Sequence, residues 1–308
     1  MKKLFYWVCV LLAATTIAAC SSNDDFYPNN TNGIKVNNVD NFDSIKSRII
    51  TLGKKDLGYN RTVITRGEKW KRFWTGVRDV LFADAEGAVK GCREHGEIIV
   101  NSVAASFQKA IDIIKEGRDS TTHKGATPGT STPSGIVSCN PNHINDVKIN
   151  PSTGCMADSV GILHNAIISG AISDHPSMYF WEGLTKEQFV DTLCEETKKV
   201  LGDPSKPILT EAQRIDVINS LGNYTSNETP EETISRITSN NPKLGGTLDV
   251  VLEYINQLYK TDSFEEGKKY SEEVIGIIEN SDLSEDDKAS LRLGVSVAFA
   301  SANLWNKE

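Results

Sequence analysis

The chain has 308 residues, with 33 lysines and arginines against 41 aspartates and glutamates, 39% hydrophobic residues and 7% aromatic residues. These fractions are typical of a globular protein and exclude collagen-like, low-complexity, wholly disordered and multi-span membrane proteins. A net charge of −8 provides no broad positive surface for phosphates, so we expect no nucleic-acid partner.

The first twenty residues predict export and lipid attachment. Two lysines precede an apolar run from Leu4 to Ile17, which is too short for a permanent membrane span. The run ends in Ile17-Ala18-Ala19-Cys20, which resembles the lipobox of bacterial lipoproteins. This resemblance implies that residues 1–19 are a signal peptide and that Cys20 is lipidated and holds the mature chain on the outer-membrane lipid. An ordinary signal peptide with a chance cysteine and an uncleaved helical anchor are the alternatives.

The residues after Cys20 predict a flexible, lipidated tether over 20–44. The acidic cluster Ser21-Ser22-Asn23-Asp24-Asp25-Phe26 resembles the tag that carries Bacteroidota lipoproteins to the cell surface. The tag implies a surface-exposed protein, whereas without it the protein would face the periplasm. The Asn-rich residues up to Asn41 contain few apolar side chains and favour a chain without regular structure.

An N-terminal helical part is predicted over 45–118. Apolar residues recur at helical spacing from Trp70 to Leu81, and Ala83, Gly87 and Gly91 form a stripe of small residues for close helix packing. A second helix is expected near 98–116. The alternation of Trp70 and Trp74 with basic residues also allows an antagonistic, membrane-active helix. Residues 66–94 carry seven basic and five acidic side chains, which favours core packing with a solvated face.

A loop rich in Ser, Thr, Pro and Gly, followed by an irregular insertion, is predicted over 119–157. Two short β-tolerant pieces near 136–155 allow a small hairpin or no regular element. A C-terminal helical part follows over 158–308, because five hydroxyl residues stand three positions before Gln, Glu or Asp as helix-capping boxes do. Residues 291–299 alternate with a period of two, but their helical neighbours favour a buried helix over a strand.

Four cysteines remain after removal of the signal and lipidation of Cys20. Cys139 and Cys155 flank a loop and form the candidate disulfide, whereas Cys92 and Cys194 lie on predicted helices as buried thiols. Cys139, His143, Cys155 and His164 also form a series of candidate metal ligands, although the spacing matches no zinc module. His143 and His164 are its candidate histidines, and we expect no metal and no cofactor.

Short Asp-Ser/Thr tripeptides resemble the acceptor pattern of Bacteroidota O-glycosylation. Of these, Ser44 and Ser120 are the candidate sites, because both fall in segments expected to be exposed.

The predicted fold is all-α, a helical bundle or stacked helical array with a small irregular or β-hairpin insertion near 136–155. The chain resembles cell-surface lipoproteins of Bacteroidota, including the segments Ala83-Asp84-x-x-Gly87-Ala88-x-x-Gly91 and Asp158-x-x-Gly161-x-x-His164-Asn165. That resemblance implies no particular activity. The sequence contains no nucleotide-binding, metalloprotease or nucleophile-elbow motif. We expect a non-enzymatic surface lipoprotein with a protein or glycan partner. The alternatives are a hydrolase or metal-dependent site around His164, with Asp158 and His143, and the membrane-active Trp70–Trp74 helix.

Overall fold

The computed structural model describes residues 38–56, 68–90, 95–119, 147–151, 155–202, 207–221, 228–261 and 263–305. Within these ranges the chain forms eleven helices and no strand, which confirms the predicted all-α fold. None of the described helices combines the length and the apolar character that a membrane span requires.

The helices follow one another along the chain with short connections in the C-terminal part. The earlier helices are α2 (Asn38–Asp56), α3 (Glu68–Lys90), α4 (His95–Asp119), α5 (Met156–Asp174) and α6 (Met178–Glu182). The later helices are α7 (Lys186–Leu201), α8 (Glu211–Leu221), α9 (Pro230–Asn240), α10 (Pro242–Leu258), α11 (Phe264–Glu279) and α12 (Glu285–Trp305).

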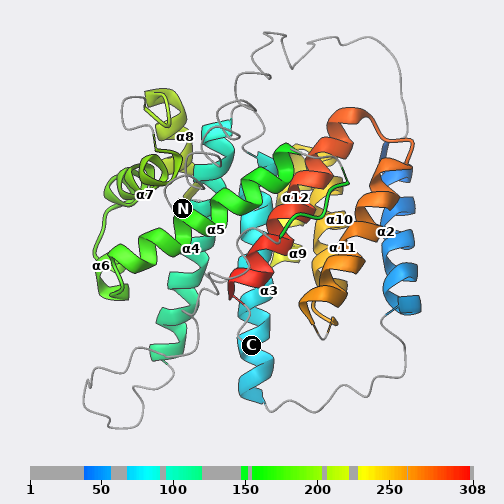
Figure 1. Cartoon of the computed structure of the whole chain (residues 1–308), viewed down its shortest axis with the longest axis horizontal. Coiled ribbons are helices and arrows are strands. Elements are labelled where there is room, and N and C mark those ends of the chain that lie inside the picture. Colours follow the sequence, from blue (N-terminus) through cyan, green and yellow to red (C-terminus); the bar gives the residue numbers. More distant parts are fainter. Residues whose placement is uncertain are drawn as a thin grey trace, which may run out of the picture.

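The C-terminal helix α12 lies in the middle of the fold (Figure 1). It packs against α3 and α5 most extensively and also against α10 and α11. Because neighbours surround it, every residue from Leu293 to Ser301 is buried. This explains the period-two pattern: from Leu293 to Phe299 the larger apolar residues alternate with Gly294, Ser296 and Ala298, which are buried as well. The predicted helix over 291–299 is therefore confirmed.

Other helices flank α12 and α3 on two sides (Figure 1). On one side, α10 packs against α2, α3, α9 and α12, and α11 packs against α2 and α12. On the other side, α4 packs against α3, α5, α7 and α8. Trp181 of α6 is buried there, with its ring centroid 4.7 Å from that of Phe107 and 5.9 Å from that of Phe189.

Two glycines allow close approach between helices at this centre. A Cβ atom at Gly87 would lie 2.7 Å from the carbonyl oxygen of Asn101, so α3 and α4 touch through their backbones. A Cβ atom at Gly161 would lie 2.9 Å from the Cβ atom of Ala300, where α5 meets α12. The predicted role of the small-residue stripe in packing is confirmed at Gly87, while Gly91 lies outside the described residues.

The predicted capping boxes are present in the C-terminal part. Three boxes, at the starts of α7, α8 and α9, contain two hydrogen bonds each. The threonine hydroxyl oxygen accepts from the backbone N–H three residues later, and the side-chain oxygen of that later residue accepts from the threonine N–H. The pairs are Thr185–Gln188, Thr210–Gln213 and Thr229–Glu232. Ser263 and Ser284 accept backbone hydrogen bonds in the same way from Glu266 and Asp287. The boxes fix where five helices begin.

One predicted boundary differs from the structure. Helix α2 begins at Asn38, so residues 38–44 of the predicted tether are helical, because Phe42 and Ile45 already contribute to the core. Within the predicted insertion near 136–155, the described residues 147–151 form no regular element, although Val147 and Ile149 are buried. The rest of that segment up to residue 146 lies outside the described residues.

Candidate functional site

A cluster of buried polar side chains lies where α3, α5 and α12 meet. Asp84 comes from α3, His164 and Asn165 come from α5, and Ser301 comes from α12. Asp84, His164 and Ser301 are fully buried, and Asn165 is 2% exposed. Gly161 allows α5 to approach α12 closely at this cluster, while Gly87 allows α3 to approach α4 beside it. The two segments that the sequence marked separately are therefore joined in space.

The contacts within this cluster are directional. His164 Nδ1 lies 3.0 Å from Asn165 Oδ1, and Asn165 Nδ2 donates to the carbonyl oxygen of Ala300 over 2.8 Å. His164 Nε2 lies 3.6 Å from Asp84 Oδ2, to which the hydroxyl of Ser301 donates a hydrogen bond. A hydroxyl from α4, that of Ser102, donates to the backbone carbonyl of Asp84 over 3.0 Å.

The carboxylate that faces His164 is Asp84, which the sequence-based site did not include. Asp158 is also buried, but its oxygens accept hydrogen bonds from the backbone amides of Ile149 and Asn150, both over 3.2 Å. The side chain of Asn150 donates to Asp158 Oδ1 over 2.8 Å as well. Asp158 therefore holds the irregular residues 147–151 onto α5, and no described contact joins it to His164.

The cluster contains a serine, a histidine and an aspartate, but their arrangement differs from that of a hydrolase triad. The hydroxyl of Ser301 donates to the carboxylate rather than to the imidazole, so no base activates it. All three side chains are fully buried, and neither of the two described cavities is lined by any of them. The geometry gives no support to a hydrolase at His164.

The candidate metal series is only partly described. Cys155 stands immediately before α5 and His164 lies more than two turns further along it, with its ring nitrogens directed to Asn165 and Asp84. Among the described residues no group of three or more His, Cys, Asp or Glu side chains could hold a metal ion. Cys139 and His143, the other two members, lie outside the described residues.

Other predicted site residues fall in different places. Ser44 is exposed on α2, within a helix rather than in a tether. Cys155 is a free thiol, and its predicted partner Cys139 lies outside the described residues, as do Cys20 and Ser120. Cys194 is also free, and burial raises the pKa of its thiol to about 11, so it is a poor nucleophile at neutral pH.

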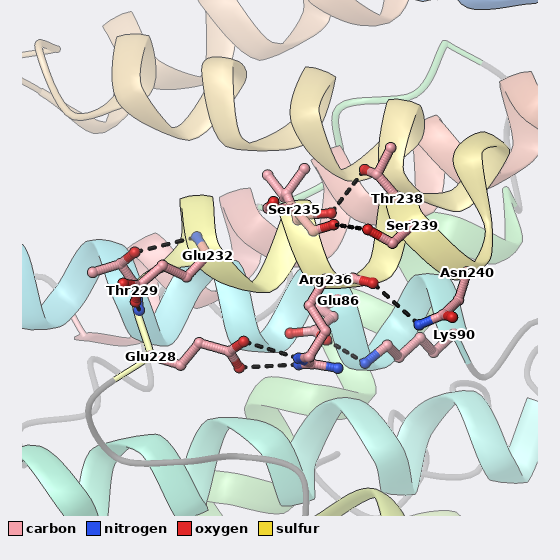
Figure 2. Close-up of polar contacts among 11 residues, drawn as sticks. Glu86, Lys90, Glu228, Thr229, Glu232, Ser235, Arg236, Thr238, Ser239 and Asn240 are labelled. Atoms are coloured by element: carbon pink, nitrogen blue, oxygen red, sulfur yellow. Dashed lines mark hydrogen bonds and ion pairs between the residues drawn. The ribbon is translucent and has the colours of Figure 1, made fainter.

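A second set of charges lies between α3 and α9 (Figure 2). Arg236 donates two hydrogen bonds to the carboxylate of Glu228, over 2.9 and 3.0 Å, and these hold the pKa of Glu228 below its usual range. Beneath them, Lys90 forms an ion pair with Glu86, whose side chain is almost completely buried. The two ion pairs drawn in Figure 2 each join residues of one segment, and Glu232 belongs to the capping box of α9. The ion pair that joins α3 to α9 is that of Arg78 with Glu231, over 3.2 Å.

Two of the cavities formed by the described residues are open to solvent. One, of about 60 Å³, lies where the middle of α3 meets the ends of α10 and α12 and the start of α11, and it is smaller than a substrate pocket. The other is an open groove of about 640 Å³ along α2, beside Ile277 of α11. Hydroxyl groups and two basic side chains line this groove, which we call the α2 groove: Ser44, Ser47, Arg48, Thr51, Leu52, Lys55 and Ile277. Among the described residues, none forms an ion pair with Arg48 or Lys55.

Sequence reasoning missed Asp84 and Ser301 as members of the cluster, although a signal was present. Asp84 stands between Ala83 and Ala85, two positions after Phe82, in a run from Val80 to Ala85 that is otherwise apolar and buried. A carboxylate with such neighbours cannot reach water and needs a buried partner. Ser301 stands between two alanines of α12, so its hydroxyl is also expected to need a buried partner, although a hydroxyl is less costly to bury than a carboxylate.

The chain matches no protein-family model, no curated protein and no solved structure.

Proposed function

We propose that this chain is an outer-membrane lipoprotein that is anchored through Cys20, faces the cell exterior and acts by binding or by a structural role in the envelope rather than by catalysis. The observation that carries the proposal is the sequence Ile17-Ala18-Ala19-Cys20 at the end of a short apolar run. Acyl chains on a terminal cysteine hold a protein on a bilayer, because each buried methylene contributes about 0.8 kcal/mol.

The described body is consistent with a role that needs no catalytic site. Its most prominent polar cluster, around Asp84 and His164, is closed to solvent and holds helices together. The α2 groove presents hydroxyls and two cations without ion-pair partners among the described residues. It lies on the first described helix, and its donors suit a hydroxyl-rich or anionic partner.

Metabolic labelling of cells with a palmitate analogue tests the anchor. The wild-type protein should incorporate the label, and the Cys20→Ala variant should not. The control is Cys9→Ala, which changes the other cysteine of the first twenty residues and should leave labelling unchanged. A wild-type protein without label, or a Cys20→Ala variant that keeps it, would contradict the anchor.

Surface exposure is a separate part of the proposal and has its own test. Protease added to intact cells should digest the wild-type protein while a periplasmic marker survives. Replacing both Asp24 and Asp25 with asparagine, which removes the acidic cluster, should protect the protein until the cells are lysed. Protection of the wild-type protein in intact cells would place it on the periplasmic face and leave the anchor itself unaffected.

A further inference from the structure

A carboxylate and an imidazole face each other at the centre of the body without a hydrogen bond between them. Asp84 Oδ2 and His164 Nε2 are 3.6 Å apart, and neither side chain has exposed surface. Asp84 Oδ1 and His164 Nε2 have no hydrogen-bond partner within the described part of the chain. Unpaired polar atoms are costly in a protein interior. The favoured protonation state of this pair is therefore the one that leaves the fewest buried polar groups uncompensated.

Asn165 determines the position of one proton. Its Nδ2 atom donates to the carbonyl oxygen of Ala300 over 2.8 Å, and a carbonyl oxygen can only accept. The opposite end of the amide, Oδ1, therefore faces His164 Nδ1 at 3.0 Å. Because Oδ1 also can only accept, Nδ1 must carry a proton, and Nε2 is the ring nitrogen directed at Asp84.

Besides the proton on Nδ1, four arrangements of a second proton are possible: it can be absent, or lie on Asp84 Oδ1, on Asp84 Oδ2 or on His164 Nε2. With no further proton, a bare Nε2 lone pair would face an unneutralised, fully buried carboxylate. With a proton on Asp84 Oδ1, a hydroxyl donor would be buried without an acceptor and Nε2 would still lack a donor. With the proton on Nε2, the two groups carry opposite charges and the N–H is directed at Oδ2. A proton on Asp84 Oδ2 would also give Nε2 a donor, but a protonated carboxyl oxygen accepts the hydroxyl of Ser301 more weakly than a carboxylate oxygen does. The placement on Nε2 is the one that keeps the charged acceptor of Ser301 and places a cation 3.6 Å from the buried carboxylate.

We propose that His164 carries both ring protons in the folded protein, so that a buried imidazolium and the Asp84 carboxylate form an ion pair that joins α5 to α3. The hydroxyl of Ser301 completes the arrangement from α12 by donating to the same carboxylate. Nearby buried acids have other partners: Asp158 accepts from Asn150, and Glu86 pairs with Lys90. The ion pair belongs to the folded body and is independent of the Cys20 anchor.

Long-range ¹H–¹⁵N NMR of the ring nitrogens tests the proposal at about pH 7.5, where an exposed histidine is mostly neutral. In the wild-type protein both nitrogens of His164 should have the chemical shift of a protonated nitrogen; the His164→Gln variant assigns the signal. In the Asp84→Asn variant the introduced amide can donate to Nε2, so the histidine should become neutral with a bare Nε2. The control Glu86→Gln removes another buried acid of α3 and should leave the His164 signal unchanged.

The wild-type spectrum decides the question even if Asp84→Asn does not fold. A bare Nε2 in the wild-type protein overturns the proposal, whether the missing proton lies on Asp84 or on neither group. A wild-type protein that retains zinc by elemental analysis, with an Nε2 signal that moves when a chelator is added, overturns it as well, because a metal ion would then occupy the position of the proton.

Discussion

At the residue scale, glycines within helices have different roles that depend on what lies opposite them. Gly87 faces the backbone of α4, where a Cβ atom would lie 2.7 Å from the Asn101 carbonyl oxygen and 2.9 Å from the Ser102 Cα atom. Gly276, within α11, faces open space: beyond its own stretch of helix, no described heavy atom lies within 4 Å of the position that its Cβ atom would occupy. Both glycines cost helix stability, but only Gly87 repays that cost through close packing.

The same substitution should therefore have opposite effects at these two glycines. Gly276→Ala should raise the free energy of unfolding by about 0.5–1 kcal/mol, because alanine favours the helix and meets no neighbour. Gly87→Ala should lower it by about 1–2 kcal/mol, because the methyl group pushes α3 away from α4. Urea denaturation of both variants measures the two changes. A stabilised Gly87→Ala variant would show that α3 and α4 can separate without cost.

Also at this scale, the buried acid was harder to assign than its histidine. Sequence reasoning selected His164 because it stands beside Asn165 and after Asp158 and Gly161 in α5. It paired His164 with residues close in the chain, whereas the carboxylate that faces it belongs to α3. Spacing along one helix indicates neighbours within that helix only, and a partner eighty residues away in sequence becomes visible only when the helices are packed.

At the scale of single elements, the ends of the C-terminal helices are fixed by local hydrogen bonds. Thr229 and Glu232 exchange two hydrogen bonds, over 2.8 and 3.2 Å, at the start of α9, and Pro230 follows at the first helical position. These contacts need only four consecutive residues, so sequence could predict them. The start of α2 had no such signal, and the structure places it earlier than predicted.

Removal of one cap should cost stability that removal of a similar hydroxyl within a helix does not. Thr229→Ala should lower the free energy of unfolding by about 1 kcal/mol, because backbone donors at the start of α9 lose their partner. The matched control is Thr192→Ala in α7, where the hydroxyl donates to the Gln188 carbonyl oxygen and alanine is the better helix former. Thermal or urea unfolding of both variants compares them, and equal losses would contradict a specific role for the cap.

At the scale of the whole molecule, helix α12 contacts both sides of the fold while α8 lies at its margin (Figure 1). α12 packs against α3, α5, α10 and α11, and every residue from Leu293 to Ser301 is buried. α8 packs on α4 and α7 and buries only Val217 and Leu221. The opening of α8 disturbs few contacts, whereas the exposure of α12 requires both sides to separate.

Native-state hydrogen exchange should reflect this difference. Amides of α12 between 293 and 301 should exchange only through global unfolding, and their protection should fall when urea lowers global stability. Amides of α8 should exchange faster, through local opening that urea affects little. Mass spectrometry or NMR can follow both segments in one sample. Equal protection of α8 and α12 would show that the fold opens as a single unit.

The sequence by itself determined the helical class, the capped helix starts and the small-residue contact at Gly87, because each depends on residues within one or two helical turns. It also contains the lipobox, which stays a prediction on residues outside the described ranges. Only the tertiary structure decided that α12 lies at the centre and that Asp84 faces His164. These facts depend on which helix faces pack together, and that choice reflects burial summed over the whole chain rather than any local pattern.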